Sequence, residues 1–205
     1  MKEESKIIAD YYGDKIRKHG VSPEGVDWNG KESQYVRFDE LSKVLPGDAK
    51  SCADIGCGYG AYLTYLNENG RDDLSYTGYD LSEEMINEAV RLHGEKSNFV
   101  KIDSIEAVPL NEYAIASGIF NVRQNINDDQ WTRYIQQSLR LINNISSKGF
   151  AFNLLTSYSD VDKQRDYLYY ASPEEFFKFC KENFSKNVAL LHDYGLYEFT
   201  IIVRK

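Results

Sequence analysis

Short apolar runs that alternate with helical patterns constrain the fold of this chain more than any other feature of its sequence. Strands that alternate with helices in this way indicate a mostly parallel sheet with helices on both faces. The runs expected to form strands cover residues 51–57, 74–80, 98–103, 112–118, 148–156, 186–194 and 198–204. The helical patterns between the first six of these runs cover residues 60–69, 81–94, 128–145 and 172–184. We therefore expect an α/β fold built on a doubly wound sheet of seven strands.

The last two expected strands break this alternation. Only a few residues around Gly195 separate the run at 186–194 from the run at 198–204. A parallel crossover needs about a dozen residues or more, so this pair must form an antiparallel hairpin. We expect a mostly parallel sheet with an antiparallel C-terminal strand, whereas a plain dinucleotide-binding sheet would finish with another parallel strand.

Two of the expected helices carry recognisable start signals. Ser82 is a candidate N-cap, and acidic residues follow it in the first turn of the helix. Ser172 is a second candidate N-cap, and Pro173 follows it at the first helical position. These signals place both helices directly after strands or loops of the expected sheet.

Length, charge and cysteine content exclude several classes of protein. The formal net charge of −8 argues against a nucleic-acid partner, which needs a basic face. No apolar run approaches the roughly 20 residues of a membrane span, and the charged N-terminus lacks the apolar core of a signal peptide. The 3 cysteines are odd in number and suit reduced thiols better than a disulfide framework or a zinc site. We expect a cytoplasmic protein with no metal, no nucleic-acid partner and no membrane contact.

The chain of 205 residues is long enough for one domain with a full core and too short for two large ones. We expect residues 1–205 to form a single domain. In this domain, residues 1–49 would form an N-terminal helical cap and residues 50–205 the core, with an insertion near 156–172.

A glycine-rich turn, DIGCGYGA, joins the first expected strand to the helix that follows it. Turns of this kind bring backbone N–H groups to a bound nucleotide. Gly56, Gly58 and Ala61 alone satisfy a dinucleotide fingerprint, so this motif leaves nicotinamide, flavin and sulfonium cofactors open. Asp54 favours the last of these, because a carboxylate there would repel a pyrophosphate and would suit the ammonium group of an amino-acid-like cofactor.

Three aspartates end consecutive expected strands: Asp54, Asp80 and Asp103. An acid at Asp80 can accept both ribose hydroxyls of a nucleotide, and an acid at Asp103 can accept the adenine amine. Open α/β sheets bind ligands in the crevice at the carboxyl ends of their strands. We therefore expect all three aspartates to line one crevice.

Together these motifs resemble those of the class I S-adenosylmethionine-dependent methyltransferases. DIGCGYG is similar to the first motif of that family, GYDLSEEMINEA to the second, FVKIDS to the third and YAIASGIFN to the fourth, and the resemblance covers about residues 50–205. It implies a Rossmann-like fold, methyltransferase activity and S-adenosyl-L-methionine as the cofactor. The resemblance would place Asp54, Gly56, Cys57 and Gly58 at the methionine end of the cofactor, and Asp80, Leu81 and Met85 at its ribose and adenine. It would place Asp103, Ser104 and Ile105 at the adenine rim, and Ser117 and Gly118 beside the sulfonium.

Absent motifs narrow the acceptor. The sequence SGIFNVRQ lacks the Asn/Asp-Pro-Pro-aromatic element of methyltransferases that act on base amines or glutamine. The chain also lacks a Pro-Cys pair for pyrimidine carbon and an acidic metal cluster of the catechol type. The remaining acceptor atoms are an oxygen or a nitrogen of a small molecule or of a protein side chain. Of these acceptors, we expect a small polar metabolite or sugar derivative. Methyl transfer needs a general base only where the acceptor must lose a proton, so no catalytic residue is assigned.

The acceptor pocket is expected from segments that fold over the methyl donor: residues 1–40, the turn after the fourth strand, and residues 156–172. The candidate residues are Tyr12, His19, Asn121, Arg123, Tyr158 and Arg165. The two arginines would suit an acceptor that carries a phosphate or a carboxylate. Arg37 could pair with the cofactor carboxylate or be an exposed helix arginine, and it lies in a Trp…Glu-Ser-Gln…Arg-Phe stretch that resembles the N-terminal part of some bacterial methyltransferases.

Two other functions remain as alternatives. An NAD-dependent oxidoreductase is disfavoured by Asp54, by the terminal hairpin and by the lack of a substrate domain. A non-catalytic S-adenosylmethionine-binding protein that regulates or scaffolds a partner would keep the same glycines and Asp80.

Overall fold

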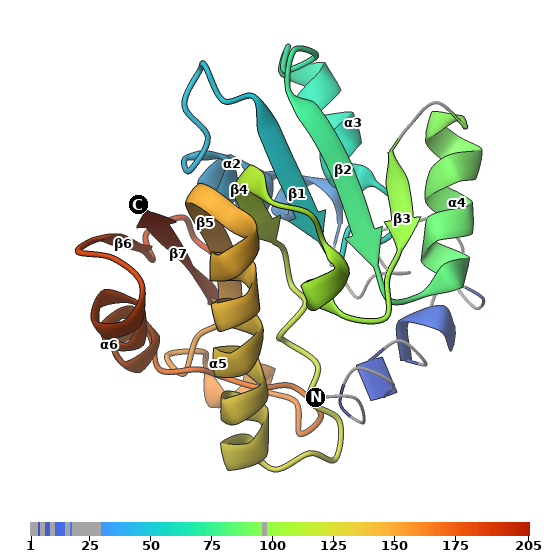
Figure 1. Cartoon of the computed structure of the whole chain (residues 1–205). Helices are drawn as coiled ribbons and strands as arrows, with labels where there is room; N and C mark the ends of the chain where they lie inside the picture. The colour runs from blue at the N-terminus through green and yellow to red at the C-terminus, as the bar shows by residue number, and fades with distance from the viewer. Residues whose placement is uncertain (1–3, 5–6, 9–10, 15–16, 18–29, 96–97) are drawn as a thin grey trace.

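The computed structural model describes residues 4, 7–8, 11–14, 17, 30–95 and 98–205. In this part of the chain a seven-stranded sheet has the order β3-β2-β1-β4-β5-β7-β6, with helices against it (Figure 1). The strands are β1 (Ser51–Ile55), β2 (Ser75–Asp80), β3 (Phe99–Lys101), β4 (Asn111–Ala116), β5 (Ser146–Leu155), β6 (Asn187–Leu191) and β7 (Glu198–Arg204). The helices are α2 (Lys31–Ser42), α3 (Ala61–Glu68), α4 (Glu83–His93), α5 (Asp128–Ile145) and α6 (Pro173–Asn183), with 3-10 turns η2 (Ile105–Ala107) and η3 (Val161–Lys163).

The direction of the strands confirms the expected mixed sheet. Strands β1 to β5 pair in parallel, whereas β7 pairs antiparallel with both β5 and β6. The last two strands therefore form the expected hairpin, and β7 lies inside the sheet between β5 and β6. This is the doubly wound, Rossmann-like arrangement that the alternation of strands and helices predicts.

Two apolar clusters fill the two faces of the sheet. Successive residues of a strand point to opposite faces, and β5 shows this directly. Phe150 and Phe152 belong to the cluster that also contains Trp131 of α5, whereas Ala151 between them belongs to the cluster that contains Phe38 of α2. Helices α5 and α6 thus cover one face, and α2, α3 and α4 cover the other. Because the sheet is buried on both faces, it holds the loops at its carboxyl edge on a rigid base.

The expected helix starts are confirmed. The Ser82 hydroxyl accepts a hydrogen bond from the Met85 N–H at 3.3 Å at the start of α4. The Ser172 hydroxyl accepts one from the Glu175 N–H at 3.2 Å at the start of α6, where Pro173 is the first helical residue. Both caps satisfy N–H groups that have no partner within the helix.

The segment near 156–172, expected as an insertion, lies against the loop that follows β4. The Arg123 N–H donates to the Tyr167 carbonyl at 3.0 Å, and the Tyr169 N–H donates to the Asn121 carbonyl at 2.8 Å. Farther along the segment, the Ser157 N–H donates to the Ala171 carbonyl at 2.8 Å. These backbone bonds join two segments that the sequence analysis assigned to the acceptor pocket.

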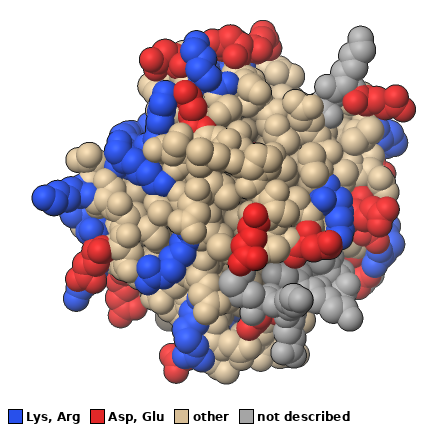
Figure 2. All heavy atoms as spheres, viewed as in Figure 1, with Lys and Arg blue, Asp and Glu red and all other residues tan. Residues whose placement is uncertain are grey.

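Charged residues of both signs are interspersed on the surface. On the face drawn in Figure 2, lysine and arginine side chains alternate with aspartate and glutamate around the edge, and uncharged residues cover most of the centre. Within the described ranges, no helix has the length and apolar character needed to cross a membrane. Cys52, Cys57 and Cys180 are free thiols, and all three are buried.

Candidate active site

A cavity lies where β1, β2 and β4 end, at the carboxyl edge of the sheet. Most of the sequence-predicted cofactor residues line it, namely Asp54, Gly56, Cys57, Gly58, Asp80, Leu81, Met85, Ser104, Ile105 and Ser117, together with Gly118. Further lining residues come from α2, α3 and α5, from the loops after β1 and β4, and from the N-terminal segment: Ile8, Tyr12, Gln34, Phe38, Tyr59, Tyr62, Ile119, Tyr134 and Ser138. The topology thus gathers the predicted residues at one place.

The glycine-rich turn forms the part of the cavity that follows β1. Gly56 and Gly58 have φ values of 73° and 54°, in the left-handed region that favours glycine. The N–H groups of Gly56 and Cys57 both donate to the Tyr79 carbonyl, at 2.7 and 3.1 Å, so the turn is fastened to β2. A Cβ atom on Gly56 would lie 2.2 Å from Cγ2 of Ile119. Glycine is favoured here because any side chain would collide with that of Ile119, in the loop after β4.

Asp80 connects the glycine turn to the start of α4. Its Oδ2 accepts the Gly58 N–H at 2.9 Å, and its Oδ1 accepts the Ser82 N–H at 2.8 Å. Burial raises the pKa of Asp80, and the backbone hydrogen bonds oppose that shift. A carboxylate oxygen has room for a second donor, so Asp80 can hold this geometry and still accept hydroxyl groups of a ligand in the cavity.

Asp54 is buried at the end of β1, with 2% of its surface exposed. The Tyr76 hydroxyl donates a hydrogen bond to Oδ2 of Asp54 at 2.7 Å. Burial raises the pKa of Asp54 to about 7; the Tyr76 hydrogen bond lowers it and the nearby Asp80 charge raises it. A cationic group in the cavity would favour the charged form of Asp54.

Asp103 does not line the cavity, which corrects the expectation that all three aspartates line one crevice. Strand β3 ends at Lys101, two residues earlier than the sequence suggests, and the chain then turns into η2. The Asp103 side chain is 91% exposed and forms an ion pair with Lys101. Its neighbours Ser104 and Ile105 line the cavity instead.

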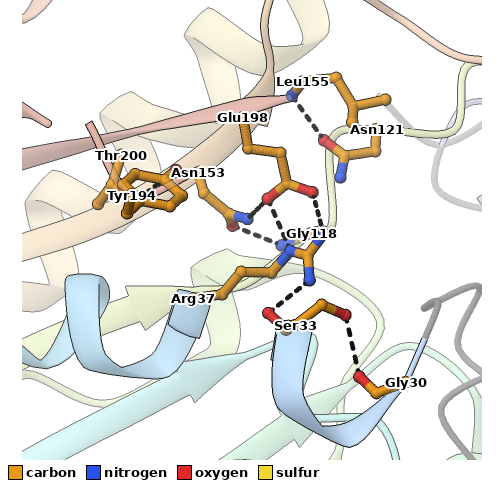
Figure 3. Close-up of polar contacts among 10 residues, drawn as sticks. All are labelled: Gly30, Ser33, Arg37, Gly118, Asn121, Asn153, Leu155, Tyr194, Glu198 and Thr200. Carbon is orange, nitrogen blue, oxygen red and sulfur yellow. Dashed lines mark hydrogen bonds and ion pairs between the residues drawn. The ribbon is translucent and has the colours of Figure 1, made fainter. Parts of the chain in front are cut away.

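Arg37 is buried, which corrects the alternative of an exposed helix arginine, and it is not among the described residues that line the cavity. It lies on α2 with 7% of its surface exposed and forms a buried ion pair with Glu198 (Figure 3). Gln34 and Phe38, on the same helix, line the cavity in its place. The partner of Arg37 lies 161 residues away in the sequence, and no local pattern indicates such a pairing.

Of the six acceptor-pocket candidates, only Tyr12 lines the described cavity, and His19 lies outside the described residues. Asn121 accepts the Leu155 N–H at 3.2 Å, and the exposed Tyr158 donates to Glu174. Arg123 donates to the carbonyls of Gln124 and Ile126 and lies 3.0 Å from an Asp128 oxygen, and Arg165 donates to the carbonyls of Asp162 and Gln164. These four side chains therefore interact with other parts of the protein, and none of them lines the cavity where a methyl acceptor would bind.

Two hydroxyl groups at the cavity are buried without a hydrogen-bond partner. They belong to Ser117, after β4, and to Ser138, on α5. Ser138 was not predicted from the sequence, but it carried a signal: it is a polar residue on the face of α5 that also carries Ile135, Leu139 and Ile142. Buried hydroxyls nearly always have partners, so a ligand in the cavity is expected to supply them.

The donors and acceptors around the cavity fit a nucleoside joined to an amino acid. Asp80 suits ribose hydroxyls, Asp54 suits an ammonium group, and the glycine turn lets a ligand approach the backbone closely. Leu81, Met85 and Ile105 give an apolar surface for a flat ring. S-adenosylmethionine contains each of these parts.

Comparisons with known proteins agree with this chemistry. A family model described as "Methyltransferase domain" matches residues 52–144. A protein of Mycobacterium tuberculosis (strain ATCC 25618 / H37Rv), named "Putative methyltransferase Rv1506c", is 49% identical over 162 residues, which cover 79% of this chain and 97% of that protein.

Two solved structures share the fold. The magnesium protoporphyrin IX methyltransferase ChlM from Synechocystis PCC 6803, with bound SAH, aligns with a TM-score of 0.65 at 16% identity over 98% of this chain and 99% of that chain. A DhpI–SAH complex aligns with a TM-score of 0.66 at 15% identity over 98% of this chain and 96% of that chain. At such identities, the likeness concerns the fold alone.

Proposed function

This chain belongs to the class I S-adenosylmethionine-dependent methyltransferases, and on that premise we propose that it transfers a methyl group from S-adenosylmethionine to oxygen or nitrogen of a small molecule. The observation that carries this proposal is the cavity in which Asp54, Asp80 and the turn at Gly56 meet. Family membership leaves no support for an NAD-dependent oxidoreductase, and no contact among the described residues favours a purely regulatory protein.

In this proposal each part of the cavity holds one part of the cofactor. Asp80 accepts the ribose hydroxyls, and Asp54 faces the ammonium group of the methionine arm. Leu81, Met85 and Ile105 pack against the adenine. When bound, S-adenosylmethionine supplies an electrophilic methyl group on a sulfonium, and the cofactor remaining after transfer is a neutral thioether.

The protein's own contribution is alignment and exclusion of water. In-line displacement gains most of its rate from holding the acceptor, the methyl carbon and the sulfur in register within a pocket that contains little water. Ser117 and Gly118 would face the reacting centre from the end of β4, and α2 would close the cavity with Gln34 and Phe38. No described residue is required as a base unless the acceptor must lose a proton.

The lining supports an acceptor that is polar and uncharged. Ile8, Tyr12 and Phe38 present aromatic and aliphatic surface, and Gln34 presents an amide. Among the described lining residues there is no lysine, arginine or histidine. The expectation of an anionic acceptor depended on Arg123 and Arg165, whose guanidinium groups have other partners, so we propose a small neutral metabolite or sugar derivative.

Calorimetry and a transfer assay test the proposal. We expect the purified chain to bind S-adenosylmethionine and S-adenosylhomocysteine and not NAD. We also expect transfer of labelled methyl groups to a member of a panel of small hydroxyl and amine metabolites. The variant Asp80→Ala is the matched control in both assays. Tight binding of NAD, or no binding of either sulfur cofactor, would contradict the proposal.

A further inference from the structure

A chain of hydrogen bonds runs from helix α2 to the loop after β4 (Figure 3). Nε and Nη2 of Arg37 donate to Oε2 and Oε1 of Glu198, the first residue of β7, at 2.8 and 2.7 Å. Nδ2 of Asn153, on β5, donates to the same Glu198 Oε2 at 2.5 Å. Oδ1 of Asn153 accepts the backbone N–H of Gly118 at 2.8 Å. We name these four residues the relay.

The relay has a fixed geometry because its three side chains are buried. Arg37, Glu198 and Asn153 have exposed fractions of 7%, 2% and 0%. A two-point contact between a guanidinium and a carboxylate fixes the plane of both groups. The carboxylate of Glu198 can only accept and the N–H of Gly118 can only donate, so a single orientation of the Asn153 amide satisfies both.

The three side chains of the relay connect two walls of the cavity without lining it. At one end, α2 contributes Gln34 and Phe38 to the lining, and Arg37 also donates to the Ser33 carbonyl at 2.6 Å, within the same helix. At the other end, Gly118 itself lines the cavity. Arg37, Glu198 and Asn153 are not among the described lining residues.

The loop that contains Gly118 is held by β5 at a second point. The Leu155 N–H of β5 donates to Oδ1 of Asn121 at 3.2 Å, as Figure 3 also shows. Asn153 and Leu155 therefore fasten the two ends of a loop that includes Ile119, the residue above Gly56.

We propose that the relay is a positioning device for methyl transfer, through which Arg37 on α2 sets the backbone of Gly118 at the reacting centre. The inference rests on the proposed function, because it requires a methyl donor to be aligned at this wall. Alignment decides the rate of an in-line displacement, and a shift of about 1 Å can cost on the order of a hundredfold in rate. Arg37, Glu198 and Asn153 are positioning residues, since they act through Gly118.

A purely structural role for the buried pair gives a different expectation. An ion pair that only joins α2 to β7 would change global stability and would raise the exchange of all core amides together. If the residues have a positioning role, their substitution changes the amide exchange of Gly118 and the affinity for ligands that reach it. The other core amides stay protected from exchange. The two roles can therefore be separated by a local measurement.

The test uses two relay variants and one control. Arg37→Met/Glu198→Leu removes both charges together, so that neither is left buried and unpaired. Asn153→Leu removes the hydrogen bonds of Asn153 to Glu198 and from Gly118 and leaves the ion pair in place. It keeps the test valid if the double variant does not fold. Lys31→Met/Glu68→Leu is the control, because it removes an ion pair that joins the same helix to α3.

Amide hydrogen exchange by NMR is measured on the ligand-free proteins, with Gly56 as the internal reference because its N–H bonds to Tyr79 within the same site. Calorimetry then compares S-adenosylhomocysteine with adenosine, which lacks the methionine arm. In both relay variants we expect Gly118 to exchange at least about tenfold faster relative to Gly56. We expect affinity for S-adenosylhomocysteine to fall by about tenfold or more while adenosine stays within about twofold. The control should match the wild type in each measurement.

Unchanged relative exchange at Gly118 in a folded relay variant would overturn the relay while leaving the proposed function intact. The same holds for relay variants with wild-type affinity for S-adenosylhomocysteine. A wild-type chain that binds neither S-adenosylmethionine nor S-adenosylhomocysteine would instead overturn the proposed function, and with it the role given to the relay.

Discussion

The Tyr76 hydroxyl donates a 2.7 Å hydrogen bond to Asp54, which places a phenol next to a carboxyl group that lines the cavity. Both residues are buried, on neighbouring parallel strands. Burial holds the pKa of Asp54 at about 7, so its charge depends on pH near neutrality and on what occupies the cavity.

The contribution of Asp54 to the stability of the ligand-free protein should therefore decrease as pH rises from about 4 to about 7. The pKa of Asp54 is raised from 3.8 to about 7, so in this window the folded state keeps a proton that the unfolded state has released. The stabilisation is complete below the lower value and is lost as pH rises through the upper one. Urea unfolding at several pH values measures the effect.

Asp54→Asn should flatten that dependence, because the amide keeps an acceptor for Tyr76 and cannot ionise. Asp39→Asn is the control, since Asp39 accepts the Tyr65 hydroxyl but is itself exposed. Bound S-adenosylmethionine should also reduce the loss of stability if its ammonium faces Asp54. An equal pH slope in the wild type and in Asp54→Asn would contradict the assignment.

Asp80→Ala should weaken binding of S-adenosylmethionine by a few kcal/mol at most, since charged hydrogen bonds contribute about 1.5–3 kcal/mol each. The loss has two sources, because the variant removes the acceptor for ribose and also releases the N–H groups of Gly58 and Ser82. Asp80→Asn should keep part of the affinity. Calorimetry on the folded variants measures these affinities. If Asp80→Ala binds S-adenosylmethionine with wild-type affinity, the assignment of Asp80 to the binding site is wrong.

Gly56→Val should abolish cofactor binding and also lower thermal stability. The first atom of any side chain at this position would lie 2.2 Å from Ile119, and a φ of 73° is unfavourable for a β-branched residue. Gly56→Ala combined with Ile119→Ala should recover stability relative to Gly56→Ala alone, because the collision is relieved. Thermal unfolding of the three variants gives the comparison, and no recovery would mean that backbone strain is the larger cost.

Ser138→Ala should weaken binding of S-adenosylhomocysteine without lowering the stability of the free protein. Its hydroxyl has no partner, so removing it should be neutral or stabilising by up to about 1 kcal/mol. Ser146→Ala is the control: the Ser146 hydroxyl donates to the Ile142 carbonyl at 2.8 Å, and its loss should destabilise. Unchanged ligand affinity in Ser138→Ala would show that the ligand does not reach α5.

The sheet and the glycine turn could be predicted because local patterns determine them. The alternation of apolar runs with helices, the short link around Gly195 and the spacing from Asp54 to Gly58 are all visible within short windows. Asp103 was misplaced because β3 ends at Lys101, and strand ends depend on pairing rather than on the strand's own residues.

The relay could not be predicted, because its contacts join residues far apart in the sequence. Arg37 meets Glu198 across 161 residues and Asn153 meets Gly118 across 35. Asn153 did carry a signal, as a polar residue within the apolar run GFAFNLL of β5. A buried amide in such a run needs partners for both its donor and its acceptor, and here each partner lies on another strand or loop.

The position of β7 has a consequence for synthesis. Strand β7 follows every other element in the sequence, yet it pairs with β5 inside the sheet and provides Glu198. A nascent chain on the ribosome therefore completes the glycine turn and α5 before the residue that orients Asn153 has been made. The contacts of Glu198 with Arg37 and Asn153 can therefore form only after translation has passed the start of β7, and until then the Asn153 side-chain N–H lacks this acceptor.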